Sequence, residues 1–296
     1  MALDVDGILE DIKETFEDGE KIITADCLFP KSKRKQASRT YIVIHTDRRE
    51  LFLKYAPEAK SGEFKKEYEA LKKVSSEEFV TPKPIKVFNK GIVVSKVSGN
   101  LFNKMISECG LSQEVRLLVR QAITHLSSFH IENTRRVLMT VNLDDLYKDL
   151  TGAEISAETR GFLGQANIGF THGDFDPFNI LLLDKKTPGL FGLVDWEDFR
   201  ENGIQELDAL HFVTMLCVIL NPNASHKELF EIMFKKQGSF YLDLLKVYCD
   251  KRKTSLSEIL KIIPVYCDTQ NHRLTRAHRN TDDFLYNDFK KIYHEP

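Results

Sequence analysis

Asp174, Asn179 and Asp195 have the side-chain types and the order along the chain that a reaction at phosphate would use. Asp174 and Asn179 lie five residues apart in a polar loop, and Asp195 follows the second of two short apolar runs. Those runs, at 180–183 and 190–194, are predicted to be strands, and the Pro and Gly between them favour a tight turn. Such a hairpin would bring two carboxylates and an amide together at one end.

These residue types suit phosphoryl transfer. Mg²⁺, which accompanies a nucleotide donor, is a hard cation that prefers oxygen ligands and keeps several waters. A side-chain amide and one carboxylate can supply such ligands, and a second carboxylate can accept the proton of an attacking hydroxyl. The alternative is a surface loop between two core strands, in which Asp and Asn act only as turn residues. The complete ordered set favours the chemical interpretation.

The motif has a known counterpart. Residues 172–174 read His-Gly-Asp, Asn179 follows, and residues 195–197 read Asp-Trp-Glu. This set resembles the aminoglycoside phosphotransferase and choline kinase superfamily, whose loop reads H-G-D-x-x-x-x-N before a D-W-E-like metal motif. That superfamily is related to the protein kinases, whose loop has H-R-D instead. The resemblance implies that Asp174 is the catalytic base and that Asn179 and Asp195 are Mg²⁺ ligands.

A donor-binding pair is predicted earlier in the chain. Lys54 lies in an apolar predicted strand, where a lysine is costly unless it is paired. The segment 62–74 has helical periodicity and carries Glu67. In kinase-like families a strand lysine binds the donor phosphates and a helix glutamate holds it, so the resemblance implies this pair. The alternative for Glu67 is a solvated helix carboxylate. The resemblance also places the nucleotide base on backbone groups between Ser95 and Val97.

The basic loop 30–39 departs from the kinase pattern. Kinases place a glycine-rich loop here, because bare backbone can lie close over phosphates, but this loop contains no glycine. Three interpretations stay open. Ser32, Ser38 and cationic side chains replace the backbone contacts; the loop is a solvated hairpin tip, which is the favoured interpretation; or the donor is not ATP.

Other polar residues are assigned to supporting roles or left open. His130 is predicted to be a structural hydrogen-bonding residue rather than a catalytic one. The resemblance implies that His172 and Asp208 are scaffold of the catalytic loop, and Asp208 is also predicted to cap the helix that follows it. Glu197 could contact a second metal, the acceptor or only solvent. The basic stretch 272–279 could bind an anionic acceptor, although a solvated helix face is favoured.

Composition narrows the class of protein. The 296 residues, 42% hydrophobic and 29% charged, are those of a globular protein with a sizeable core. A net charge of −2 gives no field that would recruit nucleic acid or an anionic membrane. The five cysteines lack metal or redox spacing, which indicates reduced thiols in a cytoplasmic protein. No apolar run approaches the roughly 20 residues that span a bilayer.

The predicted fold class is α+β, with a protein-kinase-like, two-lobed fold. A small antiparallel-sheet lobe over residues 1–98 is expected to bind nucleotide. A larger, mainly helical lobe over residues 99–296 is expected to carry the catalytic and acceptor-binding groups.

The predicted activity is transfer of the γ-phosphate of ATP, with Mg²⁺, to a hydroxyl of a small molecule. GTP is an alternative donor, and a sugar, an amino alcohol or a glycan intermediate would each fit as acceptor. A polycationic aminoglycoside is disfavoured because acidic and basic residues nearly balance in the C-terminal part. The alternative function is a nucleotide-binding pseudokinase that acts as a scaffold or sensor. The oligomeric state is left open.

Overall fold

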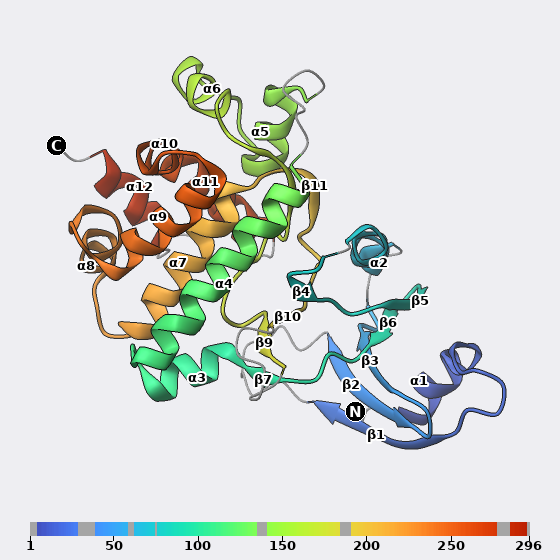
Figure 1. Ribbon diagram of the computed structural model, residues 1–296. Coiled ribbons are helices and arrows are strands. Elements are labelled where there is room, and N and C mark those ends of the chain that lie inside the picture. Colours follow the sequence, from blue (N-terminus) through green and yellow to red (C-terminus); the bar gives the residue numbers. More distant parts are fainter. Residues whose placement is uncertain are drawn as a thin grey trace. The chain divides into compact units, whose positions relative to one another are not determined.

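The computed structural model describes residues 5–28, 39–58, 62–74, 76–134, 141–183, 191–276 and 285–294, with only the backbone for Asp6 and Glu63. The chain has an α+β fold made of two compact units (Figure 1). The first, here called the sheet unit, comprises Met1–Ser76, Val80–Ser98 and Gly192–Glu197. The second, the helical unit, comprises Glu77–Phe79, Gly99–Phe191 and Asp198–Pro296.

The sheet unit is built on a five-stranded antiparallel sheet in the order β1-β2-β3-β6-β5. Its strands are β1 (Ile22–Leu28), β2 (Thr40–Thr46), β3 (Glu50–Tyr55), β5 (Pro84–Phe88) and β6 (Gly91–Ser95). The same unit contains α1 (Val5–Asp11), the short 3₁₀ turn η1 (Lys13–Thr15) and α2 (Glu63–Lys73). Ile42, Leu53 and Val93 are fully buried on the central strands, and Ile8 and Ile12 pack against them from the N-terminal segment. This apolar layer makes β3 the fixed centre of the unit.

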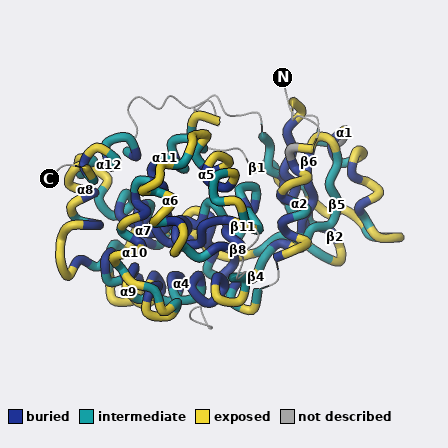
Figure 2. Tube along the Cα trace, turned by 90° about the horizontal axis from the view of Figure 1, so that it is seen from above, coloured by how far each residue is buried: buried dark blue, intermediate teal, exposed yellow. Residues whose placement is uncertain are grey.

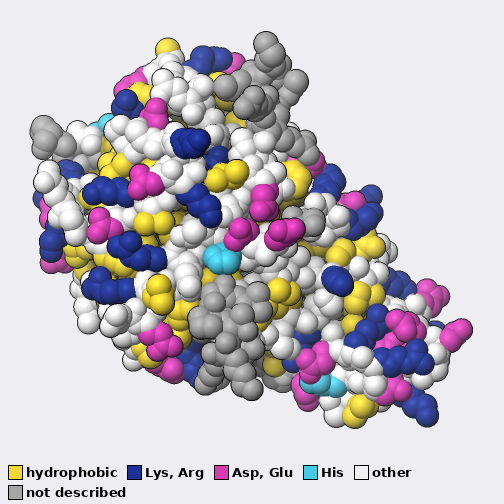
Figure 3. Space-filling view, viewed as in Figure 1, with side chains coloured by type: hydrophobic (Ala, Val, Ile, Leu, Met, Phe, Trp, Pro, Cys, Tyr) yellow, Lys and Arg dark blue, Asp and Glu magenta, His cyan; other side chains and the backbone are white. Residues whose placement is uncertain are grey.

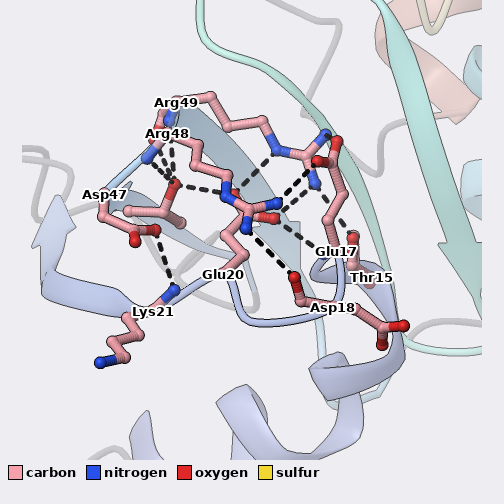
Figure 4. Close-up of polar contacts among 9 residues, drawn as sticks. Thr15, Glu17, Asp18, Glu20, Lys21, Asp47, Arg48 and Arg49 are labelled. Atoms are coloured by element: carbon pink, nitrogen blue, oxygen red, sulfur yellow. Dashed lines mark hydrogen bonds and ion pairs between the residues drawn. The ribbon is translucent and has the colours of Figure 1, made fainter.

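A polar cluster ties the N-terminal segment to the turn between β2 and β3 (Figure 4). Arg49 donates from Nε and Nη2 to the Glu20 carboxylate at 3.0 and 2.8 Å, and Thr46 donates to the same group at 2.7 Å. The hydrogen bond from Arg49 lowers the pKa of Glu20 to about 2. Arg48 adds contacts to Glu17 and to a backbone carbonyl. These hydrogen bonds stabilise the sheet unit, and none of the residues in the cluster is a predicted site residue.

The helical unit contains most of the described helices and four short strands that lie wholly within it. Its elements are β7 (Asn100–Leu101), α3 (Phe102–Cys109), α4 (Gln113–Glu132), α5 (Leu143–Thr151), α6 (Ala157–Leu163), β8 (Ile168–Thr171), β9 (Ile180–Leu182), β11 (Arg200–Ile204), α7 (Glu206–Leu220), α8 (His226–Phe230), the π-helical turn η2 (Glu231–Lys235), α9 (Phe240–Arg252), α10 (Leu256–Lys261), α11 (Ile263–Arg276) and α12 (Leu285–Tyr293). The chain passes between the units within β4 (Phe79–Val80) and β10 (Phe191–Leu193).

Helices α4 and α7 form the centre of the helical unit, and Figure 2 shows how much of each is buried. Eleven of the 15 residues of α7 are buried, which explains its largely apolar sequence. Ser112 caps α4 by accepting a hydrogen bond from the Val115 backbone. Helix α4 packs against α9, and α11 packs against α5 and α12. Helix α4 also contacts β8, the strand that leads into the loop with Asp174.

Two local predictions are confirmed, and two features were not predicted. The predicted strand that carries Lys54 is β3, and the segment with helical periodicity at 62–74 contains α2. The pairing of β11 with β8 and the long helix α11 were not predicted, because short β11 has no apolar run and α11 is rich in polar residues. The predicted turn at 184–189 and nearly all of the basic loop 30–39 lie outside the described residues.

The surface has no dominant charge. On the face in Figure 3, Lys and Arg side chains alternate with Asp and Glu over both units. This mixture agrees with the net charge of −2. Among the described residues, no helix is both long and apolar enough to cross a bilayer.

Candidate active site

The sheet unit brings together three predicted site residues, here called the lysine cluster: Lys54, Glu67 and Asp195. The Lys54 ammonium donates to Glu67 Oε1 at 2.7 Å and to Asp195 Oδ1 at 2.6 Å. Lys54 comes from the central strand β3, Glu67 from α2, and Asp195 from the segment after β10. Lys54 is 7% exposed and Glu67 is 3% exposed, so the ammonium of Lys54 is hydrogen-bonded by carboxylates rather than by water.

The charge of Lys54 is stabilised by its neighbours. Burial alone would lower the pKa of Lys54, but the carboxylates of Asp195 and Glu67 outweigh it and raise the pKa above its ordinary value. Glu67 Oε2 is buried and makes no hydrogen bond within the described residues. A charged lysine with a fixed direction is suited to bind phosphate oxygens.

Asp195 has an unusual backbone. Its φ is +67°, a left-handed conformation that non-glycine residues seldom adopt and that costs on the order of 1–3 kcal/mol. The next residue, Trp196, is fully buried and donates from Nε1 to the Leu193 carbonyl at 3.0 Å, which anchors the turn. Glu197 pairs with Arg39 at 2.5 Å. Burial and the charge of Asp195 raise the pKa of Glu197, and Arg39 opposes that rise.

The helical unit brings together a second set, here called the aspartate cluster: Asp174, Asn179, His211 and Arg273. His211 Nε2 lies 3.0 Å from Asp174 Oδ1, and Arg273 Nη1 donates to the same oxygen at 2.5 Å. Asn179 Nδ2 donates to Asp174 Oδ2 at 3.1 Å and to the Asp174 carbonyl at 2.9 Å. The predicted base is thus surrounded by donors.

Hydrogen-bond chemistry fixes the orientations in this cluster. An ionised carboxylate only accepts, so His211 Nε2 carries the proton of that hydrogen bond, and His211 Nδ1 lies 3.1 Å from the Tyr266 hydroxyl. Both partners of the Asn179 amide nitrogen are acceptors, which assigns the amide and leaves its Oδ1 oxygen for another partner. A carboxylate offers about four lone-pair positions. Within the described residues, Asp174 uses both positions on Oδ1 and one on Oδ2.

The loop that carries Asp174 is held by Asp208. The Asp208 carboxylate accepts from the backbone N–H groups of His172 at 2.7 Å and of Gly173 at 2.9 Å. His130 Nε2 lies 3.3 Å from the same carboxylate. The scaffold prediction for Asp208 is confirmed, but the cap prediction is wrong, because α7 begins at Glu206 and its N-cap makes no side-chain hydrogen bond. The Asp208 carboxylate therefore accepts hydrogen bonds from the loop backbone rather than from the N-terminal N–H groups of α7.

Gly173 is required in this loop for two reasons. Its φ is +82°, and an added Cβ would lie 2.2 Å from the carbonyl oxygen of Asp198. A side chain here would push the loop away from its support.

Two neighbouring carboxyl groups have opposite pKa shifts. Burial alone would raise the pKa of Asp174, but the hydrogen bond from His211 and the charge of Arg273 hold it well below its ordinary range. Burial and the charge of Asp174 raise the pKa of Asp176 to about 6. Asp176 Oδ1 also accepts from the backbone of Phe178 at 2.8 Å and of Asn179 at 3.1 Å. Asp174 is therefore ionised at neutral pH.

The hinge prediction concerned Ser95 and Val97. The Ser95 backbone N–H already donates to the Lys83 carbonyl at 2.8 Å, and the Lys96 N–H donates to the Glu50 carbonyl. No hydrogen bond to the Val97 backbone occurs within the described residues. Val97 therefore has the free backbone groups that a nucleotide base would use, whereas the N–H of Ser95 is occupied.

Sequence reasoning missed three polar residues around Asp174. Asp176 lies inside the motif loop but occupies an unspecified motif position. His211 follows Asp208 by nearly one helical turn, a weak signal. Arg273 belongs to the basic stretch that was predicted to be a solvated face, and its contacts with Asp174 and with Asp198 at 2.8 Å overturn that prediction for this residue. No sequence signal links Arg273 to that loop.

These features can be compared with solved structures. A thermostable mutant of aminoglycoside phosphotransferase APH(4)-Ia, in a ternary complex with ADP and hygromycin B, is similar at 10% identity with a TM-score of 0.56, covering 97% of each chain. Ethanolamine kinase from Plasmodium vivax has 10% identity and a TM-score of 0.52 over 93% of this chain and 80% of its own. The fold is that of the aminoglycoside phosphotransferases and of choline and ethanolamine kinases.

Macrolide 2'-phosphotransferase MphH from Brachybacterium faecium shares this fold at 12% identity and a TM-score of 0.51, covering 98% of this chain and 99% of that one. The sequence matches no protein-family model and no curated protein. The fold predicted from the loop motif is confirmed. At these identities the similarity establishes the fold, and the chemistry depends on the side chains of this chain.

Proposed function

We propose that this chain is an ATP-dependent phosphotransferase that acts on a hydroxyl of a small molecule, with Asp174 as the base. The observation that carries the proposal is the hydrogen-bonding state of Asp174. It is ionised, its Oδ1 is held by His211 and Arg273, and Oδ2 keeps one lone-pair position next to Asn179. A fixed carboxylate with one remaining acceptor position suits capture of a single hydroxyl proton.

Asn179 and Asp195 are proposed as the Mg²⁺ ligands. Asn179 turns its amide nitrogen to Asp174, so its oxygen can bind a metal. The Asp195 carboxylate is about one-third exposed and supplies a second oxygen. Amide and carboxylate oxygens fit the preference of Mg²⁺ for hard ligands. When bound, the ion would neutralise charge on the donor phosphates.

Donor binding is assigned to the sheet unit. Lys54 would exchange its contact with Asp195 for donor phosphate oxygens while Glu67 keeps it oriented. Val97 offers backbone groups to the base, with Ser95 beside it. The APH(4)-Ia and APH(2'')-Ib structures contain ADP, which supports ATP as the donor, and GTP is the alternative.

In the proposed reaction, Asp174 orients the acceptor hydroxyl and takes its proton on Oδ2. The hydroxyl oxygen forms a bond to the γ-phosphorus as the bond to the β–γ bridging oxygen breaks, and ADP leaves. Lys54 stays protonated throughout and contributes charge rather than a proton. Positioning and electrostatic stabilisation would supply most of the rate gain.

The alternative is a nucleotide-binding pseudokinase that acts as a scaffold or sensor. It is favoured by one observation, the Lys54–Asp195 contact, which occupies both groups that a donor complex needs. Such a protein would bind nucleotide and transfer nothing. The intact aspartate cluster favours the enzyme.

Formation of ADP from MgATP, measured with sugars, amino alcohols and hydroxy acids, tests the proposal. Asp174→Asn keeps the shape of the side chain and removes its ability to take a proton. Turnover should fall by about 10²–10⁴-fold, while exposed Asp250→Asn on α9 should leave it unchanged. Near-normal turnover in Asp174→Asn would contradict the assignment, and nucleotide binding without any turnover would favour the pseudokinase.

A further inference from the structure

Arg273 on α11 faces the proposed base with part of its guanidinium unused. Its Nε lies 2.8 Å from Asp198 Oδ2 in an ion pair, and Nη1 donates to Asp174 Oδ1 at 2.5 Å. An arginine has five N–H donors in a rigid planar fork. Apart from the hydrogen bond of Nη1 and the ion pair of Nε, the other three N–H groups have no partner within the described residues. The side chain is 31% exposed, so these donors are accessible to a ligand.

The position of Arg273 is not explained by base catalysis. His211 and Asn179 already hydrogen-bond to both oxygens of Asp174 and orient it. Arg273 takes a lone-pair position on Oδ1 that a substrate hydroxyl could otherwise use. Orientation of the base therefore does not require the guanidinium, and its unused donors indicate another role.

A metal ion does not explain the arrangement either. Asp174, Asp176 and His211 place possible ligand atoms within 4.8 Å of one another. However, the nitrogen of His211 that faces Asp174 carries a proton, and Arg273 brings a positive charge to the same oxygen. Both features oppose a cation. What remains is a ligand that accepts hydrogen bonds from a planar, charged fork, which is the chemistry of a carboxylate or a phosphate.

We propose that Arg273 binds an oxyanion on the acceptor, so that the phosphorylated hydroxyl belongs to a hydroxy acid or to a phosphorylated alcohol or sugar. This inference rests on the proposed function. Asp174 Oδ2 would receive the hydroxyl while the free edge of Arg273 receives the acidic group. With ordinary hydrogen-bond lengths, the two groups would lie roughly 5–8 Å apart, a distance that a few bonds can span.

Asp174 and Asp198 serve as the frame that fixes Arg273. Two carboxylates on one guanidinium hold its plane, so a ligand does not have to order it. Their combined charge exceeds that of the arginine, so net charge alone would favour a cation. The directed N–H groups of Arg273 favour an anion, because an ammonium ligand would have to displace Arg273 from both Asp174 and Asp198.

The test uses acceptors that differ at one end only. The three-carbon set is D-glycerate, glycerol and 3-amino-1,2-propanediol, and the six-carbon set is D-gluconate, D-glucitol and 1-amino-1-deoxy-D-glucitol. Binding is measured by calorimetry and transfer by ADP formation with MgATP, in wild type, Arg273→Lys and Arg273→Gln. Arg276→Gln is the matched control, because Arg276 is exposed and lies three residues further along α11.

The acidic member of at least one set should bind about 10- to 100-fold better than its neutral and amino counterparts, as expected for charge-assisted hydrogen bonds. This preference should fall below threefold in Arg273→Lys, which keeps the charge but loses the fork, and in Arg273→Gln. It should persist in Arg276→Gln. A merely structural role would lower turnover for all acceptors alike and leave the preference intact.

Four outcomes would overturn the inference. Two concern the wild type: absence of acidic preference in both sets, whether from equal binding or from none, and preference for the amino member. The other two concern the variants: an acidic preference that survives Arg273→Gln, and an equal loss of kcat for every acceptor, which would place the guanidinium on the transferring phosphoryl group. MgATP binding and turnover with any acceptor are scored separately. Their presence with no acidic preference refutes this inference alone, and absence of both MgATP binding and turnover refutes the proposed function.

Discussion

The lysine cluster and the aspartate cluster are opposite in charge arrangement. In the first, one cation, Lys54, is held by two carboxylates, and its pKa is raised. In the second, one anion, Asp174, is held by three donors, and its pKa is lowered. Each arrangement stabilises the charged form of the central residue. The clusters differ in what remains available: Asp174 keeps an open lone-pair position on Oδ2, whereas the third N–H of Lys54 belongs to a side chain that is only 8% exposed and already paired with two carboxylates.

This difference indicates what each substrate must do. An acceptor hydroxyl can meet Asp174 without displacing a neighbour. A nucleotide must instead replace Asp195 at Lys54, so donor binding involves an exchange of partners. We therefore expect mutations in the lysine cluster to affect stability and donor affinity together, and mutations around Asp174 to separate stability from turnover.

The largest effect on stability is expected from Lys54→Met. The ammonium is almost fully buried, and its removal leaves Glu67 buried without a counter-charge. Breaking a buried ion pair in this way costs about 3–5 kcal/mol. Chemical denaturation measures the loss, and titration with MgATP measures the accompanying weakening of donor binding.

A double variant sharpens this prediction. Adding Glu67→Met to Lys54→Met removes the stranded charge and should recover part of the lost stability. Donor affinity should stay low in both variants. If the double variant is no more stable than Lys54→Met, the buried carboxylate is not the cause of the loss.

A smaller effect with the opposite sign is expected from Asp176→Asn. The pKa of Asp176 is raised from 3.8 to about 6, so the folded state holds a proton that the unfolded chain has released in that range. Asp176 therefore costs stability as pH rises from about 4 to about 6, by at most about 3 kcal/mol at pH 7. The variant should be more stable than wild type at pH 7 and similar near pH 4.

Asparagine can still accept the backbone hydrogen bonds of Phe178 and Asn179, so the loop should keep its shape. Thermal unfolding across pH 4–8 provides the comparison. Equal pH dependence in wild type and variant would show that Asp176 titrates normally and that the crowding of Asp174 and Asp176 is relieved in solution.

The two clusters also differ in how far sequence could predict them. Lys54 and Glu67 belong to a strand and a helix with clear periodicity, and their pairing follows from a known pattern. The Asp174 loop was predicted from its motif, and the fold from the same resemblance. Arg273 could not be found, because its contact depends on how α11 packs against the rest of the helical unit. No local pattern encodes that packing.

Asp208 illustrates the same limit on a smaller scale. Its type and place near a helix start predict a cap, but the loop of His172 and Gly173 supplies two unsatisfied N–H groups nearby. Tertiary partners competed successfully for the carboxylate. The π-helical turn at 231–235 and the left-handed conformation of Asp195 likewise result from packing that local propensity does not report.

The most direct test of the central claim is thermal unfolding with ATP and GTP, with and without Mg²⁺, in wild type and Asp195→Asn. Ligand at about 100 times Kd should stabilise the wild type by roughly 2.7 kcal/mol, a shift of several degrees. The account predicts that this shift requires Mg²⁺ and is lost in Asp195→Asn. Stabilisation by neither nucleotide, or a Mg²⁺-dependent shift that survives the substitution, would contradict it.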